Sequence, residues 1–410
     1  MSDIVLCFEL HQPLRLRRWP SEYKLSDFPK EHLLETYFDY EFTGAIFRRA
    51  CAKSYIPATR LLLDLVRQSK EDGKPFKLGF SLSGNFIEQC EQFEPQLLDV
   101  FKQLVDTGCV ELLSETYYHS LAYFFPGSDE FAEQVRMHKS LLERLFNCRP
   151  TTFQNTEMIY SNGVAKRAED LGFNCIYTEG TERILGPGQS ANSVYRPAGC
   201  DRIRLLLRNY QLTDDIAFRF SLRTWPGWPL TADKYVKWLS ESSGDCISIF
   251  MDFETVGEHH WEATGIFDFF KHLPPESSKY EHLNWVTPNE AIHRHEPAGE
   301  IGVPDSAPVS WADLERDVSA WLLNKNQLES FERLRRLEVP LKQLDDPILL
   351  KAWRYLQTSD HVYYISTKTG GTGAVHSYFS PFPTPDLAYD TFSKAISDLE
   401  QRVGIASHIQ

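Results

Sequence analysis

The sequence has 410 residues, which is enough for a large barrel with a smaller domain attached to it. With 42% hydrophobic and 24% charged residues, the composition excludes a disordered, collagen-like or coiled-coil protein. The formal net charge of −14 would repel nucleic acid and anionic membrane surfaces, so we expect neither as a partner. No stretch reaches the roughly 20 apolar residues that cross a bilayer.

The N-terminal residues and the cysteines indicate a cytoplasmic protein. The chain passes from Met1 almost directly into an apolar run, without the basic region and small-residue cleavage site of a secretory signal. The eight cysteines form no C-x-x-C pair, which predicts reduced, mostly buried thiols rather than a disulfide framework or a zinc knuckle.

Strand-like and helix-like patterns alternate over the first 290 residues. Apolar runs predict strands at 4–10, 76–82, 109–116, 152–158, 175–179, 203–208, 247–254 and 285–287. Amphipathic periodicity predicts helices at 56–68, 93–106, 130–146, 162–171 and 232–240. Because this alternation implies crossovers between parallel strands, we expect a TIM-like barrel, with a doubly wound open sheet as the alternative. No strand is followed by the glycine pattern of a dinucleotide or phosphate loop.

The pattern changes after residue 295. Residues 296–309 contain three prolines and two glycines, which is typical of a linker or a domain boundary. Helical patterns follow at 311–324, 326–338, 349–365 and 386–403. We therefore expect a barrel domain at 1–296 and a helical C-terminal domain at 297–410 that contributes to the cleft.

Polar side chains gather where four of the predicted strands end. The first strand is followed by His11 and Gln12, the third by His119, and the fourth and seventh contain Glu157 and Asp252 near their ends. Because the carboxyl ends of parallel strands form one face of a barrel, we expect these side chains to meet there. A single acid at a strand end is often only a helix cap. Four clusters at matching positions favour a functional site.

Paired carboxylates and aromatic residues suit the cleavage of a glycosidic bond. One carboxyl group protonates the leaving oxygen, while the other stabilises or traps the positively charged sugar carbon. Neighbouring acids separate each other's pKa values, which keeps one of them protonated near neutral pH. Aromatic residues make up 13% of the chain and can stack on sugar rings.

Five motifs, in order along the chain, resemble those of glycoside hydrolase family 57. They are H-Q-P at 11–13, G-C-V-E-L at 108–112, F-Q-N-T-E at 153–157, D-F-E-T-V-G at 252–257 and Q-T-S-D-H at 357–361. The resemblance covers most of the chain and implies a (β/α)7 barrel followed by a helical domain, with α-amylase or 4-α-glucanotransferase activity. Segments 213–220 and 359–364 are similar to the α-amylase-type members.

The resemblance also implies roles for individual residues. Glu157 would be the nucleophile, and Asp252 the general acid and base, of a retaining α-1,4-glucan-active enzyme, with the Asp214-Asp215 pair as the alternative acid. The α-glucan would be bound by His11, Gln12, Glu111, His119, Asp214, Glu254, His259, Trp261, Asp360 and Tyr363. Gln154 stands where many members carry tryptophan, which leaves the balance between hydrolysis and transfer open.

We expect no metal and no other cofactor. Histidines 11, 119, 259 and 260 are the alternative as metal ligands, but Gln12 is a poor zinc ligand in the place where zinc-dependent sugar-processing barrels carry an aspartate. A glucan-binding protein without activity and a metal-dependent carbohydrate deacetylase or mannosidase are the other classes that the sequence leaves open.

Overall fold

Seven parallel strands form a ring in the computed structural model, which describes residues 2–20 and 22–405. In order around the ring they are β1 (Ser2–Leu10), β2 (Leu78–Leu82), β3 (Val110–Leu113), β4 (Thr152–Phe153), β5 (Cys175–Glu179), β7 (Arg204–Arg208) and β8 (Cys246–Asp252). β8 pairs in turn with β1 over seven residues, from Asp3 opposite Cys246 to Glu9 opposite Asp252. The ring is joined by a single residue pair at two places: Ser114 with Phe153 between β3 and β4, and Arg208 with Ser248 between β7 and β8. The expected (β/α)7 barrel is confirmed, and the open sheet is excluded.

Three further strands lie outside the ring. β6 (Val194–Pro197) is antiparallel to β7, β10 (Glu300–Ile301) is parallel to β6, and β9 (Leu283–Trp285) is parallel to the first residues of β1. The sequence predicted β9 two residues too late, and it predicted neither β6 nor β10. Segment 296–309, which the sequence indicated as a linker or domain boundary, is packed on the barrel. It contains β10, which pairs with β6, and Val309, which forms a bridge to Tyr160.

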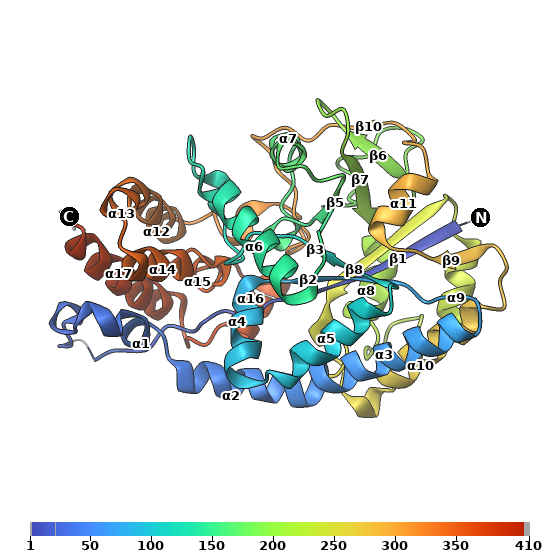
Figure 1. Cartoon of the computed structure of the whole chain (residues 1–410), viewed down its shortest axis with the longest axis horizontal. Helices are drawn as coiled ribbons and strands as arrows, with labels where there is room; N and C mark the ends of the chain where they lie inside the picture. The colour runs from blue at the N-terminus through green and yellow to red at the C-terminus, as the bar shows by residue number, and fades with distance from the viewer. Residues whose placement is uncertain (1, 21, 406–410) are drawn as a thin grey trace.

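Helices cover the outside of the ring and continue beyond it. Those that follow the chain around the barrel are α1 (Leu33–Tyr37), α2 (Tyr40–Ala50), α3 (Ile56–Glu71), α4 (Gly84–Phe93), α5 (Gln96–Asp106), α6 (Glu130–Phe146), α7 (Asn162–Asp170), α8 (Tyr210–Ala217), α9 (Ala232–Glu241), α10 (Ile266–Ser277) and α11 (Pro288–Arg294). The C-terminal helices are α12 (Lys325–Arg336), α13 (Glu338–Leu344), α14 (Pro347–Leu356), α15 (Ser359–Tyr363), α16 (Gly370–Phe379) and α17 (Pro385–Arg402). Most of these C-terminal helices gather at one end of the molecule, next to α1 (Figure 1).

The helix predicted at 311–324 is wrong. This segment has no α-helix, only a short 3₁₀ turn at Val318–Ala320. Asp313 and Arg316 adopt positive φ angles of 56° and 50°, which are incompatible with a right-handed helix. Their side chains bond to other parts of the protein instead, so tertiary contacts override the local helical pattern. The predicted helix at 349–365 is divided into α14 and α15, and residues 406–410 of the predicted helical domain lie outside the described residues.

The interior of the ring is filled by alternate residues of its strands. The Cys7 sulfur lies 3.4 Å from the hydroxyl of Tyr177, which comes from a strand on another side of the ring. Gly79 allows this packing, because a Cβ atom there would lie 2.3 Å from the Cys7 sulfur. Since side chains of a strand alternate between its two faces, Glu9 also points inward, above Cys7. All eight cysteines are free and seven are buried, as predicted. None of the described helices is long and apolar enough to span a membrane.

Candidate active site

The strand register brings polar side chains to one level at the carboxyl end of the ring. Glu9 of β1 lies opposite Asp252 of β8 on one side and Ser81 of β2 on the other. Ser81 donates a hydrogen bond to Glu115, which follows β3, at 2.9 Å. The clustering at this end that the sequence predicted is therefore present, with Glu9 as an additional member that the sequence did not reveal.

Glu157 lies in a strained turn that follows a very short strand. The strand predicted at 152–158 ends at Phe153, and Thr156–Met158 form a 3₁₀ turn in which Glu157 has φ 55° and ψ 27°. Non-glycine residues seldom adopt this left-handed conformation, which is common at functional sites. Segment 310–311 holds the turn: the Ser310 hydroxyl donates to the Glu157 carbonyl at 2.7 Å, and the Trp311 indole N–H donates to Oε2 of its carboxylate at 2.9 Å.

His119 stands between the Glu157 carboxylate and two buried acids. Its Nε2 lies 3.5 Å from Oε1 of Glu157, and its Nδ1 lies 2.7 Å from Oε2 of Glu115 and 3.6 Å from Oε1 of Glu9. Burial opposes a charge on the ring, but the carboxylates of Glu9 and Glu115 outweigh it and raise the pKa of His119 well above its usual value. His119 is thus a cation at neutral pH, and it stabilises negative charge on Glu157.

Glu9, Glu115 and His119 have the spacing of a candidate metal site. Their ligand atoms lie within 4.8 Å of one another, and all three residues are buried. A metal would need a deprotonated His119 nitrogen, whereas Nδ1 is engaged with Glu115 and the raised pKa of the ring favours a proton there. The chemistry of this donor set therefore fits a protonated histidine between carboxylates better than a metal ion.

Asp252 is exposed at the end of β8 and has the pKa of an acid near neutrality. Partial desolvation by the surrounding protein is the largest cause, followed by the negative charges of Glu254 and Glu157, while the positive charge of Arg208 works in the opposite direction. Together they raise the pKa of Asp252 to about 8. This carboxyl group is therefore protonated at neutral pH and can donate a proton.

Glu254 is buried beside Asp252 and holds Gln12. The Gln12 amide donates to Oε1 of Glu254 and to the Tyr55 hydroxyl, each at 3.0 Å, and the Tyr55 hydroxyl also donates to Glu254. Burial raises the pKa of the Glu254 carboxyl. Arg15 completes the group by donating to the Gln12 side-chain oxygen at 3.0 Å.

His11 connects the barrel to the C-terminal helices. Its Nε2 lies 3.0 Å from Oδ2 of Asp360 in α15, its Nδ1 lies 2.8 Å from the Ser83 hydroxyl, and its ring stacks on His119 with centroids 4.0 Å apart. Burial and the neighbouring His119 cation lower the pKa of His11, so its ring is neutral. Burial works against ionisation of Asp360, but the contact with His11 lowers the pKa of Asp360 nonetheless.

Asp214 belongs to a second ionic group, which contacts Trp311 through Arg208. Arg208, at the end of β7, donates to Asp214 at 2.7 Å and to Glu179 at 2.9 Å. Arg316 donates hydrogen bonds to the same two carboxylates, and its bond to Asp214 is 3.2 Å long. The Arg208 guanidinium lies over the Trp311 ring, 5.8 Å from its centroid. Segment 310–316 is therefore attached to the barrel at two places, at Glu157 through Ser310 and Trp311 and at Glu179 and Asp214 through Arg316.

In the described part of the chain, three other predicted binding residues, Tyr363, His259 and Trp261, make no side-chain hydrogen bond to the acids of the site. Tyr363 stacks on His376, with the ring centroids 3.8 Å apart. Burial raises the pKa of Tyr363, and the nearby negative charges of Asp313, Glu157 and Asp360 raise it further. His259 contacts Phe379, and burial lowers its pKa to about 4. Trp261 is 64% exposed, and among the described residues no hydrogen bond or ring contact joins its side chain to the cluster.

Glu111 is not brought to this site. It is the second residue of β3 and lies toward the opposite end of the barrel, where its carboxylate accepts hydrogen bonds from the Thr152 hydroxyl and from the Asn289 backbone N–H at the start of α11. Its position in the strand, four residues before Glu115, already separates it from the carboxyl end.

Sequence reasoning missed five residues of the site: Glu9, Glu179, Arg208, Trp311 and Arg316. Glu179 and Arg208 end predicted strands, so the argument used for Asp252 could have found them. Glu9 lies two residues before His11 and shares its strand face. Nothing in the sequence indicated Trp311 or Arg316, because their contacts depend on the path of a loop more than 100 residues from their partners.

Comparisons with known proteins identify the family. The model of Glycosyl hydrolase family 57 matches residues 5–304. A Methanocaldococcus jannaschii protein named "Putative alpha-amylase" is 44% identical over 405 residues, which cover 97% of this chain and 84% of that protein. The alpha-amylase of Pyrococcus furiosus is 21% identical over 303 residues, which cover 70% of this chain and only 41% of that enzyme.

Two solved structures share the fold. The 4-alpha-glucanotransferase from Thermococcus litoralis superposes with a TM-score of 0.68 at 16% identity, over 98% of this chain and 60% of that one, so this chain spans less than two thirds of that enzyme. The branching enzyme from Pyrococcus horikoshii superposes with a TM-score of 0.64 at 14% identity, over 100% of this chain and 98% of that one. The family match covers most of the chain and confirms the resemblance of its motifs: the protein is a glycoside hydrolase of family 57.

Proposed function

We propose that the protein is a retaining α-1,4-glucan-active enzyme of the α-amylase type, in which Glu157 is the nucleophile and Asp252 the general acid and base. The observation that carries the proposal is the contrast between the two carboxyl groups. Asp252 has a pKa raised to about 8, whereas the Glu157 carboxylate is held by the Trp311 indole and the His119 cation.

This difference between the two carboxyl groups indicates the role of each in a double displacement. Glu157 attacks the anomeric carbon, while protonated Asp252 gives its proton to the glycosidic oxygen and the leaving chain departs. A glycosyl ester on Glu157 results, and Asp252 is left ionised. Asp252 then takes a proton from water, which attacks the anomeric carbon and releases Glu157. Two inversions at this carbon retain its configuration.

The remaining groups of the site suit binding of a polyhydroxylated chain. Gln12, His11 and Asp360 offer hydrogen-bonding groups next to the acids, and they come from both the barrel and the C-terminal helices. We propose that the C-terminal part, residues 297–410, contributes to the cleft through Asp360 and Trp311. The free cysteines support a reducing compartment, and we propose a cytoplasmic location on that basis.

Transfer to a sugar hydroxyl in place of water would use the same two residues. The structural similarity to a 4-alpha-glucanotransferase makes this the second candidate. Incubation with maltoheptaose separates the two: an amylase gives only shorter products, and a transferase gives both longer and shorter ones. Either activity should be lost in Glu157→Gln. Unchanged maltoheptaose, or full activity in the variant, would overturn the proposal.

A further inference from the structure

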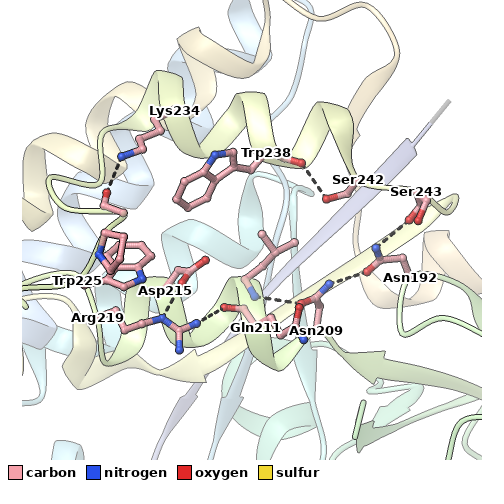
Figure 2. A pocket seen from close by; sticks show the side chains of 13 residues that line it. Asn192, Asn209, Gln211, Asp215, Arg219, Trp225, Lys234, Trp238, Ser242 and Ser243 are labelled. Atoms are coloured by element: carbon pink, nitrogen blue, oxygen red, sulfur yellow. Dashed lines mark hydrogen bonds and ion pairs between the residues drawn. The ribbon is translucent and has the colours of Figure 1, made fainter. Parts of the chain in front are cut away.

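A pocket of about 940 Å³ lies on the outer wall of the barrel, away from the acids of the active site. It is bounded by α8, α9 and the segment between them, and Figure 2 shows the side chains that line it. Helix α8 separates it from the active site: Asp214 on one side of the helix bonds to Arg208, while Asp215 on the other side lines the pocket. Its volume is in the range of sites that hold small ligands or a few sugar units.

Two half-buried tryptophans form the apolar part of the pocket. Trp225 comes from the segment between α8 and α9, and Trp238 from α9; their ring centroids are 6.0 Å apart and their planes meet at 80°. The two rings meet edge to face, and a cation lies over each of them: Arg219 is 5.7 Å from the Trp225 centroid and Lys234 is 5.5 Å from the Trp238 centroid. The indole surface that remains accessible suits the apolar face of a sugar ring.

The two cations of the pocket are already engaged within the protein. Arg219 donates to Asp215 and to the Gln211 carbonyl, both at 2.7 Å, and the Lys234 ammonium donates to the Gly227 carbonyl at 2.6 Å. An anion would have to compete with these bonds, so the pocket does not suit phosphate or sulfate. Asp215 is neutralised by Arg219, and the remaining polar side chains of the wall are neutral: Asn192, Asn209, Gln211, Ser242 and Ser243. Neutral amides and hydroxyls around aromatic rings are the groups that bind sugars.

We propose that this pocket is an accessory binding site for an α-glucan chain, separate from the active site and without catalytic residues of its own. Its ligand class rests on the proposed function, since an α-glucan is the substrate proposed for the cleft. The site would retain the enzyme on polysaccharide while leaving the cleavage of short oligosaccharides unaffected.

The position of Trp225 depends on the neighbouring glycine. A Cβ atom on Gly227 would lie 2.3 Å from the Trp225 ring, so Gly227→Ala would displace the indole without removing any side chain. Trp228 provides a matched control: it is in the same segment and 43% exposed, but it does not line the pocket.

The test is electrophoresis of the full-length protein through gels that contain soluble starch, with Asp252→Asn as the background so that the polymer is not degraded. Trp225→Ala should weaken retention about tenfold, as expected for loss of one stacking face, and Gly227→Ala should weaken it as well. Trp225→Phe should restore most of it, and Trp228→Ala should migrate like the background protein. Equal retention of Trp225→Ala and the background, or equal loss in Trp228→Ala, would overturn the proposal.

A second measurement separates this site from the active site. With Asp252 intact, Trp225→Ala should cleave maltoheptaose with unchanged kcat and KM. A raised KM would mean that the pocket is part of the cleft, which contradicts the proposal. If the protein cleaves no maltoheptaose but loses starch retention in Trp225→Ala, the proposed function fails while the glucan-binding pocket stands.

Discussion

The Trp311 indole donates its N–H to the Glu157 carboxylate at 2.9 Å, although 154 residues separate the two in the chain. Trp311 lies in a loop without regular secondary structure, and Glu157 lies in a turn with left-handed backbone. The hydrogen bond therefore joins an irregular loop to a turn whose left-handed backbone is unfavourable for a non-glycine residue. The relationship makes the loop a positioning element for the proposed nucleophile.

Trp311→Phe should lower kcat with little change in KM. The substitution keeps an aromatic ring and removes only the N–H, and a hydrogen bond to a charged group contributes about 1.5–3 kcal/mol, or roughly 10- to 100-fold in rate. Steady-state kinetics on maltoheptaose measure the effect. Trp19→Phe is the control, because it also removes an indole hydrogen bond, here to the Thr36 carbonyl. Equal losses in both variants would indicate a general effect on the fold.

Arg316 should affect catalysis indirectly, by holding the loop that carries Trp311 in place. Arg316→Gln weakens the attachment to Glu179 and Asp214, and we expect it to lower kcat several-fold. The double variant with Trp311→Phe should lose less than the sum of the two single effects, because both residues hold one loop in place. Additive losses, within about 0.5 kcal/mol, would show that Arg316 does not position Trp311.

The alkaline limit of activity should follow Asp252. Its raised pKa keeps the acid protonated below about pH 8, and kcat/KM should fall as the pH rises through that value. In Glu254→Gln one of the negative charges that raise this pKa is removed, so the decline should begin at lower pH. The measurement is the pH profile of kcat/KM for both proteins. An unmoved alkaline limb in Glu254→Gln would contradict the assignment.

Asp360→Asn should destabilise the protein in a pH-dependent way. The folded state lowers the pKa of Asp360, so its contribution is present above the unfolded value of about 4 and is lost as the pH falls through the lower, folded value. Loss of the charged partner of His11 should cost about 1–3 kcal/mol at pH 7, and the difference from the natural protein should shrink below pH 4. Thermal unfolding at several pH values tests this, with the exposed Asp390→Asn as the control. A difference that is constant over pH would contradict the role of the charge.

The sequence was sufficient for the barrel and for part of the site. The alternation of inward and outward side chains along β1, and the strand ends at Asp252 and Arg208, follow from local patterns that the barrel preserves. Glu157 was found by its motif, but its turn was not, because the pattern at 152–158 is that of a strand. Trp311 and Arg316 could not be predicted, since bonds to distant residues determine the path of their loop. Glu111 shows that a motif can also mislead: it was expected to bind substrate, but it lies toward the end of the barrel opposite the site.

The identity of the nucleophile is tested most directly by trapping the intermediate. A 5-fluoro α-glucosyl fluoride slows the release of a glycosyl-enzyme, so that digestion and mass spectrometry can locate the attached sugar. We predict a single ester on the peptide that contains Glu157, and none in Glu157→Gln. An adduct on Asp252 or Glu254, or turnover that gives an inverted product without any adduct, would contradict the account.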